Sequence, residues 1–442
     1  MSEHAHPRRA SRGTGRIRLG AFAPSPRYDR AGLYRRISAD PRIDFTAIFS
    51  SSAGVRPGDL GYGRPVSFDA DALSGYASVF LRKADRTEHV GSFTSLLDLD
   101  VVPELGRRRF DVLWLHGYYS ATHLLAATAH LARGGHLLVR EEQTLLNPRP
   151  MWKRALKRPL LAALFARSTG LFQGTRNREW FRQHGMPEER LFHVPLCVDN
   201  DFFGAEAGRY ASHELELRRE FGIDADTGPV ILSVARLVPK KQPVLLLDAF
   251  RRVRKGHRCT LLVIGSGPSE PEMREFVKRH EVPDVVFAGF MNQSAISRAY
   301  AAADVFTLTS GWDETWGLVV NEAMNFGLPV VVSDKVGSGA DMVRHGENGF
   351  VFPHDKPDEL ARYLSLLVVG EDERAAFGRR STELVAPWNY DVAADGLVAA
   401  VRSVVGPRRW ASAEAYADAQ AAPGEEARAR RHAAAGQSPG TA

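Results

Sequence analysis

The sequence predicts an α/β protein made of two doubly wound domains that face each other across a cleft. The chain of 442 residues is long for one core, because a domain commonly takes about 100–200 residues. Short apolar runs also alternate with amphipathic stretches of helix length, which is the pattern of parallel sheets covered on both faces. The alternation breaks near residues 200–225, so we expect the domain boundary there.

The expected elements follow this alternation along the chain. In the first half, apolar runs predict strands at residues 17–22, 44–49, 110–115, 137–140, 170–173 and 191–195. In the second half, they predict strands at residues 230–235, 260–264, 285–288, 305–309, 330–332 and 349–352. Amphipathic stretches predict helices at residues 243–254, 269–280 and 294–302. A last helix at residues 390–404 follows the second domain, and we expect it to pack across the interface.

The composition excludes several classes of protein. With 44% hydrophobic and 25% charged residues, the chain resembles ordinary globular proteins. Its net charge of +6 lies mostly at the ends, with +4 in residues 1–18 and +1 in residues 405–442, so the body carries too little charge to indicate binding to nucleic acid. Cys197 and Cys259 are far apart and outside any C-x-x-C pair, so neither a disulfide framework nor a zinc site is indicated.

Both ends of the chain are expected to be disordered tails, at residues 1–15 and 405–442. They are rich in alanine, arginine, glycine, serine and proline and have little apolar periodicity. No apolar run approaches the ~18 residues of a membrane span, and no apolar signal region follows the first arginines. We therefore expect a cytoplasmic protein.

The most informative stretch is TSGWDETWGLVVNEAMNFGLPVVVSD, residues 309–334. A loop presents Glu314, a helix is expected to begin near Gly317, and Glu322 lies inside that helix. A helix N-terminus offers free backbone N–H groups and a positive dipole end, which suit a diphosphate. For an isolated pair of glutamates, helix stabilisation and solvation are the more common roles, but the neighbouring glycine permits close backbone approach.

A second constellation is SVARLVPKKQP, residues 233–243. Arg236 leaves a strand, and Lys241 precedes a helix that begins at a proline. The carboxyl ends of parallel strands are where open α/β sheets bind ligands. Two cations there can offset the charge that grows on a departing diphosphate, although a bare cluster of charges is more often a solvated face.

Together these motifs, with EAMNFGLPVVVSD and GENGFVFPHD, resemble glycosyltransferase family 4, strongly over residues 229–355 and more weakly over residues 16–204. The resemblance implies the GT-B architecture, in which two Rossmann-like domains face a cleft. It implies an acceptor-binding domain at residues 16–204, a nucleotide-sugar-binding domain at residues 205–388 and a cross-over helix at residues 389–404. It further implies a retaining transfer without a metal or cofactor, most commonly from a UDP-sugar.

The resemblance also implies roles for individual residues. Arg236 and Lys241 resemble the diphosphate-binding pair, Glu314 would face the transferred sugar, and Glu322 would hold the donor ribose. Other donor contacts would come from Gly317, the backbone amides of Leu318 and Val319, and a base-binding region formed by Gly265, Gly267 and Phe290. The chain departs from the family pattern at Ala235 and Gln242, and its first loop, residues 21–28, lacks the usual glycines.

In the first domain, His116 ends an apolar strand and is the strongest candidate for a catalytic side chain. A lone histidine there is more often a satisfied core residue, but family members place a histidine near this point against the donor sugar. Arg140, Glu141 and Glu142 end another strand and are candidates to meet the acceptor. The acceptor depends on loops such as residues 54–76, so polysaccharide, glycolipid and specialised metabolite all stay open.

Gly265-Ser266-Gly267 lacks the third glycine of a dinucleotide fingerprint, and four scattered Asp-x-Asp triplets do not indicate a metal site. Residues 152–167 hold five basic and no acidic residues, so weak peripheral contact with the inner face of a membrane is conceivable, although packing against the sheet is more common. A nucleotide-sugar epimerase or phosphorylase, or a non-catalytic binding subunit, would use the same residues.

Overall fold

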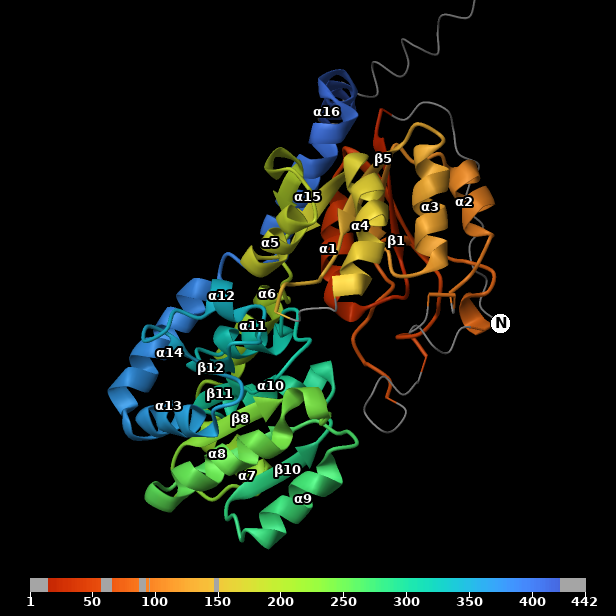
Figure 1. Ribbon diagram of the computed structural model, residues 1–442. Helices are drawn as coiled ribbons and strands as arrows, with labels where there is room; N and C mark the ends of the chain where they lie inside the picture. The colour runs from red at the N-terminus through yellow and green to blue at the C-terminus, as the bar shows by residue number, and fades with distance from the viewer. Residues whose placement is uncertain (1–14, 57–65, 87–92, 95, 147–150, 422–442) are drawn as a thin grey trace, which may run out of the picture.

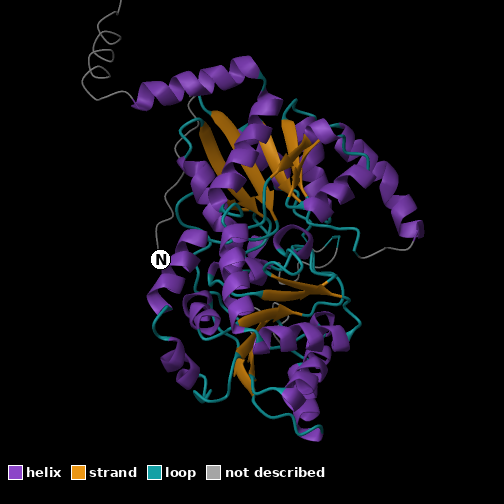
Figure 2. Cartoon of the chain, turned by 90° about the vertical axis from the view of Figure 1, so that its left-hand side faces the viewer, coloured by secondary structure: helices purple, strands orange, loops and turns teal. Residues whose placement is uncertain are grey.

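The structure is a computed structural model that describes residues 15–56, 66–86, 93–94, 96–146 and 151–421. It contains two separate parallel sheets, each covered by helices on both faces, and the two layered bodies lie one above the other (Figure 1, Figure 2). The predicted fold class is therefore confirmed. The predicted N-terminal tail lies outside the described residues except for its last residue, Gly15.

The first sheet has seven parallel strands in the order β3-β2-β1-β4-β5-β6-β7. The strands are β1 (Ile17–Ala23), β2 (Ile43–Phe49), β3 (Ala77–Phe80), β4 (Val112–His116), β5 (His136–Arg140), β6 (Ser168–Phe172) and β7 (Leu191–His193). One face of this sheet packs against α1 (Tyr28–Ala39), and the other against α2 (Val101–Arg108), α3 (Ala121–Leu131), α4 (Met151–Ala166) and α5 (Thr175–Gln183). Buried aliphatic and aromatic side chains fill both layers, which is the core expected of a doubly wound domain.

The second sheet has six parallel strands in the order β10-β9-β8-β11-β12-β13. They are β8 (Val230–Val234), β9 (Thr260–Ile264), β10 (Val285–Gly289), β11 (Val305–Leu308), β12 (Val330–Ser333) and β13 (Gly349–Phe352). One face is covered by α6 (Asn200–Tyr210), α10 (Gln293–Ala301), α11 (Leu318–Asn325), α12 (Gly339–Met342) and α14 (Glu371–Val385). The other is covered by α8 (Pro243–Gly256), α9 (Glu270–Arg279) and α13 (Pro357–Val369).

The chain enters the second domain at residue 200, at the start of the predicted boundary region and just before residue 205, where the resemblance placed the second domain. Helix α6 begins at Asn200, after the Asp199 side chain caps it, and Phe203 lies in the core of the second domain. Helix α7 (Glu214–Glu220) then leads to β8. Residues 200–204 therefore belong to the second domain, because the polar residues that interrupt the strand pattern start a helix there instead of a loop.

Two helices at the C-terminal end return to the first domain. Helix α15 (Tyr390–Val405) buries its apolar side against the same face of the first sheet as α1, so it packs within the first domain instead of across the interface (Figure 1). Helix α16 (Pro407–Ala421) follows it and buries Trp410 in the same core. The prediction of a disordered tail from residue 405 is therefore wrong up to residue 421, and residues 422–442 lie outside the described part.

Three short 3-10 helices complete the described elements, at Ala84–Arg86, Glu188–Arg190 and Pro239–Lys241. In the part of the chain that the structure describes, no helix combines the length and apolar character needed to cross a bilayer. The loops at the carboxyl ends of the two sheets face each other, so both domains supply side chains to the space between them.

Candidate active site

A pocket lies between the two domains, at the carboxyl ends of β1 and β5 on one side and of β8, β9 and β10 on the other. Its cavity volume is about 270 Å³. We call it the interdomain pocket. From the predicted donor site, its lining includes Arg236, Lys241, Gly265, Phe290, Glu314, Gly317, Leu318, Val319 and Glu322. Residues far apart in the second half of the sequence thus meet in one place, as the motifs predicted.

Lys241 and Glu314 form an ion pair at the centre of the second-domain wall. The Lys241 ammonium contacts the Glu314 carboxylate, and the side chains are each 12% exposed. The Ser310 hydroxyl donates a second hydrogen bond to the same carboxylate, at 2.9 Å. Burial opposes ionisation of Glu314, but the adjacent Lys241 cation and these hydrogen bonds outweigh it, so the pKa of Glu314 lies below its ordinary value. The carboxylate is therefore charged and held in place at neutral pH.

Helix α11 aims its N-terminus into the same pocket. Gly317 precedes the helix with a φ of +93°, a left-handed conformation that favours glycine. A Cβ at this position would lie 2.9 Å from the Leu308 side chain. The first backbone N–H groups of the helix, at Leu318 and Val319, have no partner within the helix and are suited to an anion. The glycine thus sets the direction of a pair of amide donors.

Glu322 lies one turn further along α11 and is buried, with only 4% of the residue exposed. The Tyr300 hydroxyl donates a hydrogen bond of 2.6 Å to its carboxylate. Burial raises the pKa of Glu322 to about 7, although the hydrogen bond from Tyr300 acts in the opposite direction. Glu322 can consequently accept or donate a hydrogen bond near neutral pH, depending on its protonation.

The predicted base-binding region is only partly in the pocket. Gly265 lines it and packs so closely on the preceding loop that a Cβ would lie 1.8 Å from the Ala235 carbonyl oxygen. Phe290 also lines it, with its ring 6.2 Å from the ring of Phe68 in the first domain. Gly267 is outside the lining, because it packs under the Leu237 carbonyl, where a Cβ would approach to 2.4 Å. It supports the loop without facing the pocket.

The first-domain wall contains residues that the sequence analysis missed. Arg27 and Tyr28 follow β1 and line the pocket, and Arg27 donates two hydrogen bonds to Asp29, from Nε at 2.9 Å and Nη2 at 3.0 Å. Tyr28 accepts a hydrogen bond of 3.1 Å from Gln293 of the second domain. Their signal was the position of polar residues just after the first strand, the edge where open sheets bind ligands.

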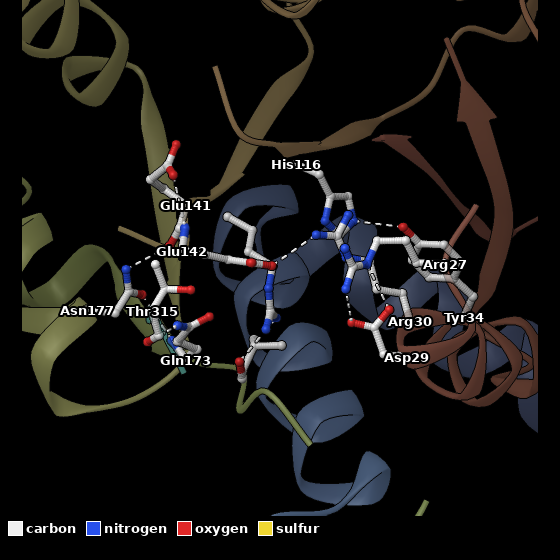
Figure 3. A network of polar contacts seen from close by, with 12 residues as sticks. Arg27, Asp29, Arg30, Tyr34, His116, Glu141, Glu142, Gln173, Asn177 and Thr315 are labelled. Atoms are coloured by element: carbon white, nitrogen blue, oxygen red, sulfur yellow. Dashed lines mark hydrogen bonds and ion pairs between the residues drawn. The ribbon is translucent and has the colours of Figure 1, made fainter. Parts of the chain in front are cut away.

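Glu142 of the first domain also lines the pocket, and Figure 3 shows its carboxylate pointing toward Arg30. Arg30 donates a hydrogen bond of 2.9 Å to Glu142. Burial acts to raise the pKa of Glu142, but Arg30, Arg140 and Arg27 together hold it below its ordinary value. Burial and the neighbouring Glu142 charge raise the pKa of Glu141 to about 7. Arg140 is buried and donates to the Val194 carbonyl at 3.2 Å, and its positive charge helps to keep Glu142 ionised.

His116 ends β4, as predicted, but it does not line the interdomain pocket. It is 4% exposed, and its Nε2 lies 2.9 Å from the Tyr34 hydroxyl (Figure 3). Burial lowers the pKa of His116 well below its ordinary value, and the nearby Arg30 and Arg140 charges lower it further, so the ring is neutral at pH 7. Its Nδ1 makes no hydrogen bond among the described residues. The structure places His116 beneath the first-domain wall, where the neutral ring supports it.

Direct hydrogen bonds join the two domains on either side of the pocket. Gln173 donates from Nε2 to the Thr315 carbonyl at 3.2 Å, next to Glu314 (Figure 3). On another side, Asp69 accepts a hydrogen bond from the Ser294 hydroxyl at the start of α10. These contacts place the two walls of the pocket at a defined separation.

The fold is shared with solved glycosyltransferase structures. HepE from Anabaena, solved in complex with UDP and glucose, has a TM-score of 0.64 and 17% identity, and the alignment covers 88% of this chain and 100% of HepE. Sucrose-phosphate synthase from Thermosynechococcus elongatus has a TM-score of 0.67 and 16% identity, with 88% and 99% coverage. At these identities the similarity shows the fold alone, which is the GT-B arrangement of two Rossmann-like domains.

Sequence comparisons identify glycosyltransferase relatives. The chain is 24% identical over 229 residues to an alpha-D-kanosaminyltransferase from Streptomyces kanamyceticus. It is 28% identical over 232 residues to a GDP-mannose-dependent alpha-(1-6)-phosphatidylinositol monomannoside mannosyltransferase from Mycobacterium tuberculosis. These alignments cover 51% and 50% of this chain and 58% of each relative, so the chain spans little more than half the length of the curated relatives it matches.

Residues 216–384 match the family model described as glycosyl transferases group 1. The match runs from α7 into α14 and includes both cations and both glutamates predicted to hold a donor. The narrower resemblance to family 4 stays a prediction. The second domain therefore carries the sequence signature of glycosyl transferases group 1, and the residues of that signature gather in the interdomain pocket.

Proposed function

We propose that this chain is a retaining glycosyltransferase that moves a sugar from a nucleotide diphosphate sugar to an acceptor hydroxyl. One observation carries the proposal. Arg236, Lys241, Glu314, Glu322 and the N-terminus of α11 line a single pocket between two domains. Cations and free amides suit a diphosphate, and carboxylates suit sugar hydroxyls, because a carboxylate accepts hydrogen bonds without neutralising the phosphate charge.

The donor diphosphate would lie against Arg236, Lys241 and the first amides of α11. These groups stabilise negative charge that grows on the departing phosphate, and such preorganised donors are worth about 10²–10³ in kcat when one is removed. Glu322 would bind the ribose and Glu314 the transferred sugar. Gly265 and Phe290 would border the base, on the side of the pocket away from α11.

The acceptor would enter along the first-domain wall, between Arg27, Tyr28 and Glu142. The carboxylates Asp29 and Glu142 on this wall are ion-paired with arginines, and Glu314 is paired with Lys241. Carboxylates held in this way are suited to bind and orient substrates and are less suited to attack the sugar themselves. We therefore propose direct attack of the acceptor hydroxyl from the face that the phosphate leaves, with the proton passing to a departing phosphate oxygen. The acceptor oxygen forms the new bond to the anomeric carbon as the bond to phosphate breaks.

The expected donor is a UDP-sugar. Support comes from HepE, which was solved in complex with UDP and glucose, whereas the mycobacterial relative is a GDP-mannose-dependent mannosyltransferase. A thermal-shift titration with UDP-glucose, UDP-N-acetylglucosamine and GDP-mannose decides between the bases, since a ligand at 100 times its Kd adds about 2.7 kcal/mol of apparent stability. Stabilisation by GDP-mannose alone would overturn the choice of UDP.

The test of the activity is release of nucleotide diphosphate from the preferred donor, measured with and without a panel of acceptors. Glu314→Gln and Lys241→Ala should each lower turnover about 10²-fold or more. Lys278→Ala removes an exposed lysine from α9 and serves as the control, with turnover unchanged. Donor binding without nucleotide release under any condition would favour a non-catalytic subunit, and near-normal rates in both site variants would refute the assigned roles.

Two further expectations accompany the proposal. The reaction should not require a metal ion, so turnover should survive EDTA, and restoration by added Mg²⁺ or Mn²⁺ would contradict this.

Weak contact with a membrane is supported by α4, where Met151 and Trp152 are 84% and 65% exposed at the start of a basic stretch of sequence. Sedimentation with anionic vesicles at low salt should be weakened by Trp152→Ser, and no sedimentation would end this idea.

A further inference from the structure

A second polar cavity lies in the first domain, at the amino ends of the sheet strands, whereas the interdomain pocket lies at their carboxyl ends. Its volume is about 560 Å³. Its lining combines the start of β1, the ends of α2 and α3, the residues before β4 and β5, and the start of α16. We call it the arginine cavity, because its lining includes Arg18, Arg109, Arg133 and Arg409.

The arginine cavity is far from the donor site. Arg18 is near the first residue of β1, whereas Arg27 of the interdomain pocket follows the last residue of the same strand. A strand of seven residues at about 3.3 Å per residue separates the two regions by roughly 20 Å. A ligand in the arginine cavity therefore could not contact a donor in the interdomain pocket.

The charges in this cavity are unbalanced. Asp111 is the one acidic residue of its lining, so four arginines and one aspartate give a charge of about +3, against +6 for the whole chain. Asp111 accepts hydrogen bonds from Arg18 and Arg409, each at 3.1 Å. Burial acts to raise the pKa of Asp111, but the hydrogen bonds from Arg18 and Arg409 hold it below its ordinary value. The aspartate therefore stays charged and fixes two guanidinium groups in position.

The remaining two arginines, Arg109 and Arg133, have N–H donors available to bind an anion. Among the residues that the structure describes, the Arg109 guanidinium makes no hydrogen bond, and Arg133 donates only to the Ala129 and Val102 carbonyls. Each guanidinium carries five N–H donors, so most of the donors on these two side chains stay available to a ligand. Donation from Arg133 to Ala129 also offsets the carbonyl dipoles at the end of α3, which would otherwise repel an anion.

The cavity is built by tertiary packing. Helix α16 brings Arg409 to it, and Arg409 donates hydrogen bonds to the Gly15 and Arg16 carbonyls as well as to Asp111. On the opposite wall, Gly135 allows the His130 ring to approach, because a Cβ there would lie 2.2 Å from His130 Nε2. An anion in the cavity would join α16 to the sheet and to the ends of α2 and α3.

We propose that the arginine cavity is a second ligand site, which binds a small molecule bearing phosphate groups. Guanidinium groups match phosphate oxygens in paired hydrogen bonds. A charge of about +3 remains after Asp111 is counted, so a ligand with several negative charges, such as a phosphate compound, suits the cavity better than one with a single carboxylate. The ligand would accept hydrogen bonds from Arg109 and Arg133 and would lie near the Arg18 and Arg409 pair on Asp111. By joining α16 to the sheet, it would stabilise the C-terminal end of the chain.

Calorimetric titration with inorganic pyrophosphate at low ionic strength tests this proposal. Pyrophosphate should also bind the donor site, so the wild-type chain should show two sites, and Arg236→Ala/Lys241→Ala should keep one. In that background, Arg109→Gln/Arg133→Gln should weaken the remaining binding at least tenfold. Both arginines are exposed, so these substitutions should not disturb folding. Arg219→Gln/Arg379→Gln removes two exposed arginines elsewhere and should leave binding unchanged.

A second readout follows α16 directly. Pyrophosphate should slow trypsin cleavage within α16 in the donor-site variant, and this protection should disappear with Arg109→Gln/Arg133→Gln. The proposal is overturned if the donor-site variant binds no pyrophosphate, or if its remaining binding does not depend on Arg109 and Arg133. Sedimentation with anionic phospholipid vesicles that depends on these arginines, without pyrophosphate binding, would also overturn it and assign the surface to a membrane.

Discussion

Replacement of Lys241 by methionine should destabilise the second domain in a way that depends on pH. The substitution keeps the length of the side chain but leaves Glu314 buried without its cation, and only 12% of that side chain is exposed. A buried, unpaired carboxylate either stays charged at a high cost or takes up a proton. The variant takes the cheaper course, so the cost of protonation sets the scale of the loss of stability.

The cost of protonation can be calculated from the ordinary pKa of a glutamate, 4.5. At pH 7, protonating such a carboxyl costs about 3.4 kcal/mol, and at pH 5.5 it costs about 1.4 kcal/mol, because one pH unit is worth 1.36 kcal/mol. In the wild-type chain the pKa of Glu314 is lowered, so its stabilisation is present above the unfolded-state pKa and is lost as the pH falls through the folded-state value. Wild type and variant should therefore converge in acid.

Differential scanning calorimetry without donor is the assay. A domain of this size shifts its Tm by about 2–4 °C per kcal/mol, so Lys241→Met should lower Tm by about 7–14 °C at pH 7 and by about 3–6 °C at pH 5.5. Adding Glu314→Gln should restore most of the loss, because no buried charge then remains. Lys278→Met is the control with an exposed lysine removed. A loss that is equal at both pH values, or simply additive in the double variant, would refute the reasoning.

Three other perturbations test the pocket. Glu322→Gln should raise Tm at pH 8.5 but not at pH 4. Burial raises the pKa of Glu322 to about 7, so the contribution of Glu322 to stability is fully present below the unfolded-state pKa and is lost as the pH rises through 7. Calorimetry should show that the effect of the substitution on stability differs between the two pH values by up to about 3 kcal/mol. Asp69→Ala removes a contact to Ser294 between the domains and should increase donor hydrolysis relative to transfer, measured as nucleotide released without acceptor; an unchanged ratio would exclude a role in closure. Gly174→Ala would place a Cβ 2.5 Å from the Trp316 ring, so it should cost about 1–3 kcal/mol and weaken donor binding in a thermal-shift titration, whereas Gly204→Ala, with nothing within 4 Å, should not.

The sequence was a good guide to the buried strands and a poor one to exposed elements. Parallel strands covered on both faces are nearly continuous apolar runs, so the strands that became β8 and β9 were found with their bounds almost correct. Strand β3, Ala77–Phe80, was missed because it is a short, half-exposed edge strand. Helix α16 was missed because its composition resembles a tail, and its buried anchor, Trp410, gives no periodic signal by itself.

The second-domain wall of the interdomain pocket was predictable because its residues lie in compact motifs at strand ends and a helix start. What the motifs could not reveal was partnership across the chain, such as the pairing of Lys241 with Glu314 over a separation of 73 residues. The first-domain wall had even less local signal. Arg27 and Tyr28 stand in a loop without the expected glycines, and only the packing of the two domains brings them opposite Arg236. For His116 the local signal was misleading: it stands at the end of a strand, as ligand-binding residues often do, but it does not line the interdomain pocket.

The charges in the pocket constrain how a donor could bind. Four carboxylates line it, and three of them are each held by a cation, in the pairs Asp29 with Arg27, Glu142 with Arg30, and Glu314 with Lys241, whereas Glu322 accepts a hydrogen bond from Tyr300. A diphosphate adds further negative charge, so it would compete with these carboxylates for any paired cation that it contacts. Arg236, Lys240 and the amides of α11 also line the pocket and can take part of the phosphate charge. Sharing Lys241 with the phosphate would weaken its hold on Glu314 and leave that carboxylate better able to accept hydrogen bonds from a sugar. Donor binding and orientation of the transferred sugar are then coupled through one lysine, which is why its replacement should impair both.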